Sequence, residues 1–179
     1  GALGGLLAFR SESLDEAQNA LGRIAIGLAE TINAQHRLGQ DLTGALGGNF
    51  FTAPAAQVLY PNTPLNGGTA VIGVAVADAN SLTTSDYRLT ADGGGNYTLT
   101  RLSDNTTVFA AAALPQTVEG LTISLSAGAA NAGDTFLIQP TRAAAGDLAV
   151  ALTDARSIAA AAPIRTAASN SNTGSGAVS

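Results

Sequence analysis

Apolar residues repeat at alternating spacings of three and four near the start of the chain, and this periodicity constrains the fold more than any other feature. The repeat runs through Leu14, Ala17, Leu21, Ile24, Leu28 and Ile32. Such spacing places the apolar side chains on one stripe of an α-helix. A long helix with a single apolar stripe packs against other long helices, so the sequence predicts part of a helical rod.

Local signals mark both ends of this helix. Residues 13–16, Ser-Leu-Asp-Glu, have the form of a capping box, in which a hydroxyl and a carboxylate bond the first free amides. His36 and Arg37 stand near the other end, where the helix dipole favours cations. We therefore expect the helix to begin near Ser13 and to end before Gly39, with Gly39 in a left-handed conformation. Gly22 and Gly27 weaken the helix, but they also permit close approach by a neighbouring helix.

From about residue 47 to 140 the apolar period changes from helical to alternating. Residues 69–77, TAVIGVAVA, predict a buried strand, and residues 86–102 predict a hairpin around the turn at 91–95. Further short strands are expected at 107–110, 121–127 and 134–140. The residues expected in the core are Tyr87, Leu89, Tyr97, Leu99, Leu121, Ile123, Leu125, Phe136 and Ile138. Short strands without intervening helices predict an antiparallel β domain.

The last part of the chain returns to helical spacing. Gly146-Asp147 offers an N-cap, and the apolar repeat runs through Leu148, Leu152, Ala155 and Ile158 or Ala159 until Pro163. The predicted fold class is α+β, with two long helices of antiparallel type flanking an inserted antiparallel β domain. The predicted domains are a helical rod segment at 1–46, the β domain at 47–141, a returning rod helix at 142–163 and a flexible tail at 164–179.

Composition excludes several classes of function. The chain has no cysteine, which excludes disulfides, thiolate zinc sites and cysteine nucleophiles. All eight basic residues are scattered arginines and the net charge is -5, so a nucleic-acid surface is disfavoured. No apolar run approaches the ~20 residues that span a membrane. The sequence begins without Met and ends in a Ser/Asn/Gly stretch, so we expect part of a longer protein.

The candidate chemistry rests on the single histidine. His36 with Asp41 has the residue types of a general base and its orienting carboxylate, but a cation at a helix end is the favoured interpretation. Gly93 to Gly95 precede a strand rather than a helix, which favours a hairpin turn over a phosphate loop. The aspartates at strand boundaries favour turns over calcium binding: Asp78, Asp86, Asp92, Asp104 and Asp134. We therefore predict no catalytic, cofactor-binding or metal-binding residues.

The first helix and its following turn resemble the flagellar hook-associated protein 1 family (FlgK). The resemblance rests on Leu3-Gly4-Gly5-Leu6-Leu7, Phe9-Arg10, Leu14, Asn19-x-Leu21-Gly22, Asn33-x-x-His36-x-x-Gly39-x-Asp41-Leu42-x-Gly44 and Phe50-Phe51. Weaker matches are Gly133-Asp134-x-Phe136, Pro140-Thr141-Arg142 and Ala151-Leu152-Thr153-Asp154. The β domain matches mainly in its layout and its last strand.

The resemblance implies a structural protein without catalysis, an adaptor at the hook–filament junction of the bacterial flagellum. It implies export through the flagellar apparatus and an extracellular location. The implied partners are other copies in a ring, the hook protein and hook-associated protein 3, with no nucleic acid, membrane or cofactor. The terminal helices through which the family polymerises have no counterpart here, so the resemblance implies a monomeric piece.

Two other classes of function stay open at the level of sequence. The first is an extracellular adhesin or glycan-binding β module with helical flanks, because Thr/Asn/Gly-rich strands often face ligands. The second, less favoured, is a hydrolase that uses His36. In the favoured reading, residues 33–44 are a helix end and a turn, and His36 serves the shape of that turn.

Overall fold

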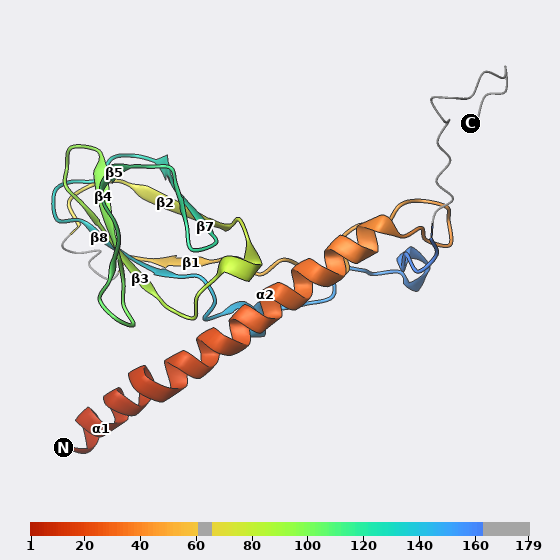
Figure 1. Ribbon diagram of the computed structural model, residues 1–179, viewed down its shortest axis with the longest axis horizontal. Coiled ribbons are helices and arrows are strands. Elements are labelled where there is room, and N and C mark those ends of the chain that lie inside the picture. Colours follow the sequence, from red (N-terminus) through yellow and green to blue (C-terminus); the bar gives the residue numbers. More distant parts are fainter. Residues whose placement is uncertain (61–65, 163–179) are drawn as a thin grey trace, which may run out of the picture. The chain divides into compact units, whose positions relative to one another are not determined.

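The computed structural model describes residues 1–60 and 66–162 (Figure 1). The predicted tail at 164–179 lies outside the described residues. The chain forms two compact units, each built from two separate segments. The first unit comprises Gly1–Glu30 with Thr52–Ala149, and the second comprises Thr31–Phe51 with the chain from Val150 onward.

The predicted first helix is present but begins earlier than expected. Helix α1 (Ala2–Phe9) continues through a π-helical turn (Arg10–Leu14) into α2 (Asp15–Leu38). The amide of Asp15 is already bonded to the Arg10 carbonyl, so Ser13 lies inside the helix and caps nothing. The capping-box prediction was therefore wrong, because the residues before Ser13 are helical and leave no free amides there.

Gly39 follows the end of α2 as predicted, but for a different reason. Gly39 is not among the glycines with a positive φ, so it does not adopt the expected left-handed conformation. A Cβ atom at Gly39 would lie 2.0 Å from the carbonyl oxygen of Ala159. The residue is glycine because a neighbouring backbone passes too close for any side chain.

The β domain contains two antiparallel sheets that share one core (Figure 1). The five-stranded sheet has the order β1-β8-β3-β4-β5 and the three-stranded sheet has the order β2-β7-β6. The strands are β1 (Gln57–Leu59), β2 (Val71–Val76), β3 (Tyr87–Ala91), β4 (Asn96–Arg101), β5 (Thr107–Ala113), β6 (Gln116–Val118), β7 (Leu121–Ala127) and β8 (Thr135–Gln139). The α+β class is confirmed, and sequence periodicity missed only the two three-residue strands, β1 and β6.

The expected core is buried with one exception. Leu89, Leu99, Ile123 and Ile138 are fully inaccessible, and the other predicted core residues except Leu125 are nearly so. Leu125 is 40% exposed. It is one of the last three residues of β7, and all three are exposed. The predicted hairpin is also present: β3 pairs with β4, and Asp92 accepts hydrogen bonds from the amides of Gly94 and Asn96 in the turn.

The returning rod helix predicted at 142–163 is not formed in the described residues of that range. Helix α3 (Ala144–Asp147) has four residues, and a 3-10 turn (Ala155–Ser157) is the only other helical element there. Backbone hydrogen bonds to the segment at 40–51, including Gln40 N–H to Ala161 O at 2.7 Å, hold the rest extended. Asp154 accepts from the Arg156 amide and caps the short 3-10 turn.

The face of α2 that is buried differs from the predicted stripe. Leu21, Ile24 and Leu28 are 59%, 67% and 45% exposed. The buried positions are instead small or polar: Asn19, Gly22, Ala25, Ile26, Ala29, Asn33 and His36. The helix therefore presents its apolar stripe outward and packs through its small and polar face.

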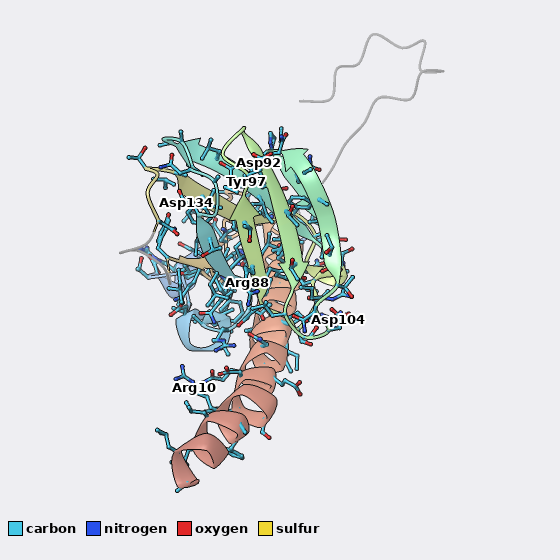
Figure 2. The ribbon with its side chains drawn as sticks, turned by 90° about the vertical axis from the view of Figure 1, so that its left-hand side faces the viewer. Arg10, Arg88, Asp92, Tyr97, Asp104 and Asp134 are labelled. Carbon is cyan, nitrogen blue, oxygen red and sulfur yellow. The ribbon has the colours of Figure 1, made fainter. Side chains whose placement is uncertain are left out.

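A buried carboxylate closes the loop that precedes β2. Asp134 accepts hydrogen bonds from the amides of Gly67, Gly68 and Asn131 at 2.9–3.0 Å. Figure 2 shows Asp134 and Asp92 toward one end of the β domain and Asp104 toward the other. The backbone hydrogen bonds, that of Asn131 first, hold the pKa of Asp134 below its ordinary value.

We predict that Asp134→Asn lowers the stability of the β domain at neutral pH. The amide retains one acceptor oxygen in place of two. Because the folded-state pKa of Asp134 is lowered, its contribution is present above the unfolded pKa of about 4 and is lost as pH falls further. Urea unfolding midpoints of the two proteins should therefore differ at pH 7 and converge toward pH 2–3. An unchanged difference across this range would contradict the assigned role of the charge.

Candidate functional site

Asp86 is the centre of a buried polar cluster in the first unit. Its carboxylate accepts hydrogen bonds from Asn19 on α2 at 3.2 Å, from Gln139 on β8 at 3.0 Å and from Arg142 at 2.5 Å. The guanidinium of Arg142 also pairs with Asp15 at 2.9 Å. The cluster thereby joins the start of α2 to the ends of two strands. Sequence reasoning had assigned Asp86 to a turn, and nothing local marks it as buried.

Thr141 completes this cluster by approaching α2 closely. Its hydroxyl donates to the Asn19 side-chain oxygen at 3.2 Å, and Thr141 is fully buried. A Cβ atom at Gly22 would lie 1.7 Å from the Thr141 carbonyl oxygen. The close approach predicted from Gly22 is real, but the neighbour is the chain after β8 rather than another helix.

A pocket of about 240 Å³ lies beside the Asp86 cluster. Its charged lining groups include Asp15, Asp86 and Arg142, which are paired with one another. The single guanidinium of Arg142 is shared by both carboxylates, so these groups hold the helix on the sheet and leave the cluster with one net negative charge beside the pocket.

A second polar cluster lies where β4 ends. Arg101 pairs with Glu119 and, at 2.6 Å, with Asp104, and the Tyr87 hydroxyl donates to Glu119 at 2.5 Å. Hydrogen bonding to Arg101 holds the pKa of Asp104 well below its usual range. Burial raises the pKa of the Tyr87 hydroxyl. These directions keep Tyr87 neutral and Asp104 charged at neutral pH, which suits a structural cluster.

In the second unit, the side chains of Asn33 and His36 hydrogen-bond to the backbone of two other segments, one around Gly48 to Phe51 and one at Ala159. The Asn33 side-chain Nδ2 donates to the Phe51 carbonyl at 2.9 Å, and its Oδ1 accepts from the Phe51 backbone amide at 2.8 Å. His36 Nε2 accepts from the Ala159 amide at 2.9 Å, and Nδ1 lies 2.8 Å from the Gly48 carbonyl. A backbone N–H can only donate, so Nε2 carries no proton and Nδ1–H donates to Gly48. Both nitrogens are thus occupied by backbone.

These contacts decide between the interpretations of His36. It is 7% exposed, and its ring is held by backbone atoms rather than positioned to cap carbonyls as an exposed helix-end cation. Asp41 serves its own turn, accepting from the Thr43 side chain at 2.7 Å and from the Thr43 and Ala45 amides. The Thr43 hydrogen bond chiefly lowers the pKa of Asp41. The structure therefore gives His36 no free nitrogen for base catalysis.

The described residues provide little for other ligands. Residues 1–60 and 66–162 contain no group of three or more His, Cys, Asp or Glu side chains placed to hold a metal ion. Within the same residues, no helix is both long enough and apolar enough to cross a lipid bilayer. Tyr87 and Tyr97 are buried and Tyr60 packs edge-on against Phe136, so the three tyrosines form no stacking platform for sugars.

The fold and its polar clusters define a structural module of helix and β domain, in which the buried polar groups serve as joints. Two family models match the chain. The model of the FlgK helical domain of flagellar hook-associated proteins matches residues 1–51, and the D2-like domain of flagellar hook-associated protein 1 matches residues 60–140. The chain belongs to the flagellar hook-associated protein 1 family.

Relatives and a solved structure agree with this assignment. The chain is 36% identical over 163 residues to flagellar hook-associated protein 1 of Salmonella typhimurium and 37% identical to that of Escherichia coli K12, covering 90% of the chain in each case. The structure of the flagellar hook junction protein FlgK from Burkholderia pseudomallei matches 89% of the chain with a TM-score of 0.78 and 42% identity. The chain spans 29% of the length of each.

We predict that Gly22→Ala destabilises the first unit by about 1–3 kcal/mol, because the new methyl group cannot fit against the Thr141 carbonyl. Gly27→Ala on the same helix is the matched control, since nothing lies within 4 Å of its Cβ position. The control should gain up to about 1 kcal/mol of helix propensity. Chemical denaturation of both variants measures the difference, and equal effects would contradict the close approach.

We predict that His36→Ala weakens the second unit locally. The substitution leaves the Ala159 amide and the Gly48 carbonyl without partners, at a cost of about 1–3 kcal/mol. Hydrogen exchange at the Ala159 amide should accelerate by roughly 5- to 150-fold, the factor that corresponds to this energy. Gln35→Ala, at an exposed neighbouring position, should leave that amide unchanged. Equal exchange in both variants would argue against the His36 contacts.

Proposed function

We propose that this chain is part of a structural adaptor at the hook–filament junction of the bacterial flagellum. The observation that carries the proposal is the similarity to flagellar hook-associated protein 1, which covers 90% of the chain at 36% identity and includes both the helix and the β domain. The proposed protein has no catalytic role. It works outside the cell after export through the flagellar apparatus.

The outward apolar stripe of α2 supports an assembled state. Leu14, Leu21, Ile24 and Leu28 are each at least 45% exposed, although they share one helix face. Together with α1, where Leu3, Leu6 and Leu7 are more than half exposed, they form an apolar surface too extensive for an isolated soluble chain. We propose that further helices of the junction cover this stripe, as the helical-rod interpretation requires.

The proposed partners follow from the same role. They are other copies of the protein in a ring, the hook protein on one side and hook-associated protein 3 on the other. Support for this set comes from the family alone. The joint at Asp86 is compatible with it, because a link between two tubes has to hold its helix and β domain in fixed positions under load.

Deletion of the gene tests the proposal. A strain that lacks it should carry bare hooks in electron micrographs and release flagellin as monomer into the medium. The wild-type gene should restore filaments. Leu21→Ser with Ile24→Ser should not, although the exposed positions leave the chain's own thermal unfolding within about 0.5 kcal/mol of wild type. Normal filaments on the deletion strain would overturn the proposal.

A control variant separates loss of the stripe from loss of helix propensity. Glu16→Ser with Ala34→Ser changes two exposed positions of the same helix that face away from the stripe. This variant should restore filaments. Failure of both double variants would point to the helix itself rather than to its apolar face.

A further inference from the structure

The sequence contains a single Asn-Gly pair, Asn66-Gly67, and it lies in the loop that precedes β2. Asparagine is one of the thermolabile residues of proteins. Its side-chain carbonyl carbon can be attacked by the backbone nitrogen of the next residue, and glycine at that position offers the least steric resistance. The pair is therefore the place in this chain where the covalent structure is most sensitive to local conformation.

Deamidation of this pair needs no reagent other than water. The Gly67 nitrogen loses its proton and forms a bond to the side-chain carbonyl carbon of Asn66, and the side-chain nitrogen leaves as ammonia. The product is a cyclic imide. Water then opens the ring at either carbonyl, which leaves aspartate or isoaspartate at position 66. The step involves no oxidation or reduction, so it proceeds wherever the two groups can meet.

In the folded chain the attacking nitrogen is held by Asp134. The Gly67 amide donates to Asp134 Oδ1 at 2.9 Å, and the Gly68 amide donates to Oδ2 at 3.0 Å. Asp134 is 3% exposed, and its lowered pKa keeps the carboxylate charged at neutral pH. A carboxylate this close holds the amide proton and disfavours negative charge on the nitrogen. It therefore opposes the proton loss that the attack requires.

The group that would be attacked is held as well. Asn66 Nδ2 donates to the Thr135 carbonyl at 3.0 Å, and Asn66 Oδ1 accepts from the Thr135 amide at 3.1 Å. The side chain thus pairs with the first residue of β8 as a neighbouring strand would. The attack would have to turn this side chain away from both partners and toward its own backbone. Three hydrogen bonds consequently close the site while the loop is in place.

The two glycines of the loop differ in how strictly the fold requires them. A Cβ atom at Gly68 would lie 2.5 Å from both the Ala129 carbonyl oxygen and Asp134 Oδ2, so a side chain is excluded there. A Cβ atom at Gly67 would approach only the end of the Asn131 side chain, at 2.9 Å, and that end can move. The labile pair can therefore be removed at position 67 without rebuilding the loop.

We propose that Asn66 is a latent modification site, which the folded loop keeps closed and which opening of the loop converts irreversibly. The product cannot restore both hydrogen bonds to Thr135. Aspartate places a charged oxygen against the Thr135 carbonyl where Nδ2 donated, and isoaspartate also lengthens the main chain before Gly67. A β domain that has stayed open long enough to react therefore cannot regain its full stability. The chemistry is the same whether or not the protein works at the junction.

Mass spectrometry of the full-length protein tests the site. The wild type is incubated at mildly alkaline pH, folded or in guanidinium chloride, and its proteolytic peptides are followed for conversion of Asn66. Conversion in the folded protein should be about 100-fold slower, because three hydrogen bonds must open and each contributes about a fivefold factor. Gly67→Ala in guanidinium chloride should react more slowly than the unfolded wild type, which assigns the reaction to the Asn-Gly pair.

Asp134→Ala tests the group that protects the site. In the folded variant Asn66 should convert at least about fivefold faster than in the folded wild type, the factor for one lost hydrogen bond. Circular dichroism checks the fold, and if the variant is unfolded, the two wild-type samples decide by themselves. Equal rates in folded and unfolded wild type, a stable Asn66 in the unfolded protein, or a folded Asp134→Ala with the wild-type rate would overturn the proposal.

Asn66→Asp tests the consequence of the modification. At neutral pH it should raise the unfolding equilibrium constant at least about fivefold, because the Thr135 carbonyl loses its donor. Asn105→Asp is the matched control, since Asn105 is exposed. The control should unfold at the wild-type urea concentration. Equal unfolding midpoints for both variants would overturn the claim that the converted loop cannot close fully.

Discussion

The carboxylate of Asp86 is the interaction on which the first unit depends. It is almost fully buried, and a buried charge is costly unless several groups compensate it. Its partners come from three parts of the chain: Asn19 on α2, Gln139 on β8 and Arg142 after the sheet. Because all three must converge on one carboxylate, the cluster fixes both the position of the helix on the sheet and its rotation about its own axis.

That rotation explains why α2 exposes its apolar face and buries its small and polar face. Asn19 has to face Asp86, and Gly22 lies one turn further along the same face, against Thr141. The apolar stripe on the other side is consequently held outward. In a single globular domain this arrangement would waste apolar surface, but in a helical rod it keeps the stripe available to neighbouring helices. In the proposed assembly, the polar joint would serve to keep the stripe exposed to neighbouring helices.

The second unit uses polar side chains for the same purpose at a smaller scale. Asn33 and His36 are one turn apart on α2 and grip backbone at Phe51, Gly48 and Ala159. The segment after Val150 has helical spacing in its sequence, yet these and neighbouring backbone contacts draw it into an extended form. The helical propensity of this segment is overridden by tertiary hydrogen bonds, because its amides are bonded to the chain at 40–51 and are not free to form a helix.

Periodicity alone was sufficient for α2, the β3–β4 hairpin and the main core, since each is determined by local spacing and turn chemistry. Leu89 and Leu99, for example, follow from alternation around the Asp92 turn. The family resemblance in the helix and the turn at Asp41 was also readable from residues near one another in the chain. Asp86, by contrast, gave no local signal, because its three partners are up to 67 residues away.

The sequence by itself determined helix α2, the six longer strands, the absence of any cysteine chemistry and the existence of an apolar stripe. Only the tertiary structure decided which face of α2 is buried, why Gly22 and Gly39 are glycines, and that the last segment is extended. The physical reason is that spacing reports the apolar face of a helix, whereas long-range hydrogen bonds and close backbone approaches select the face that meets the rest of the chain.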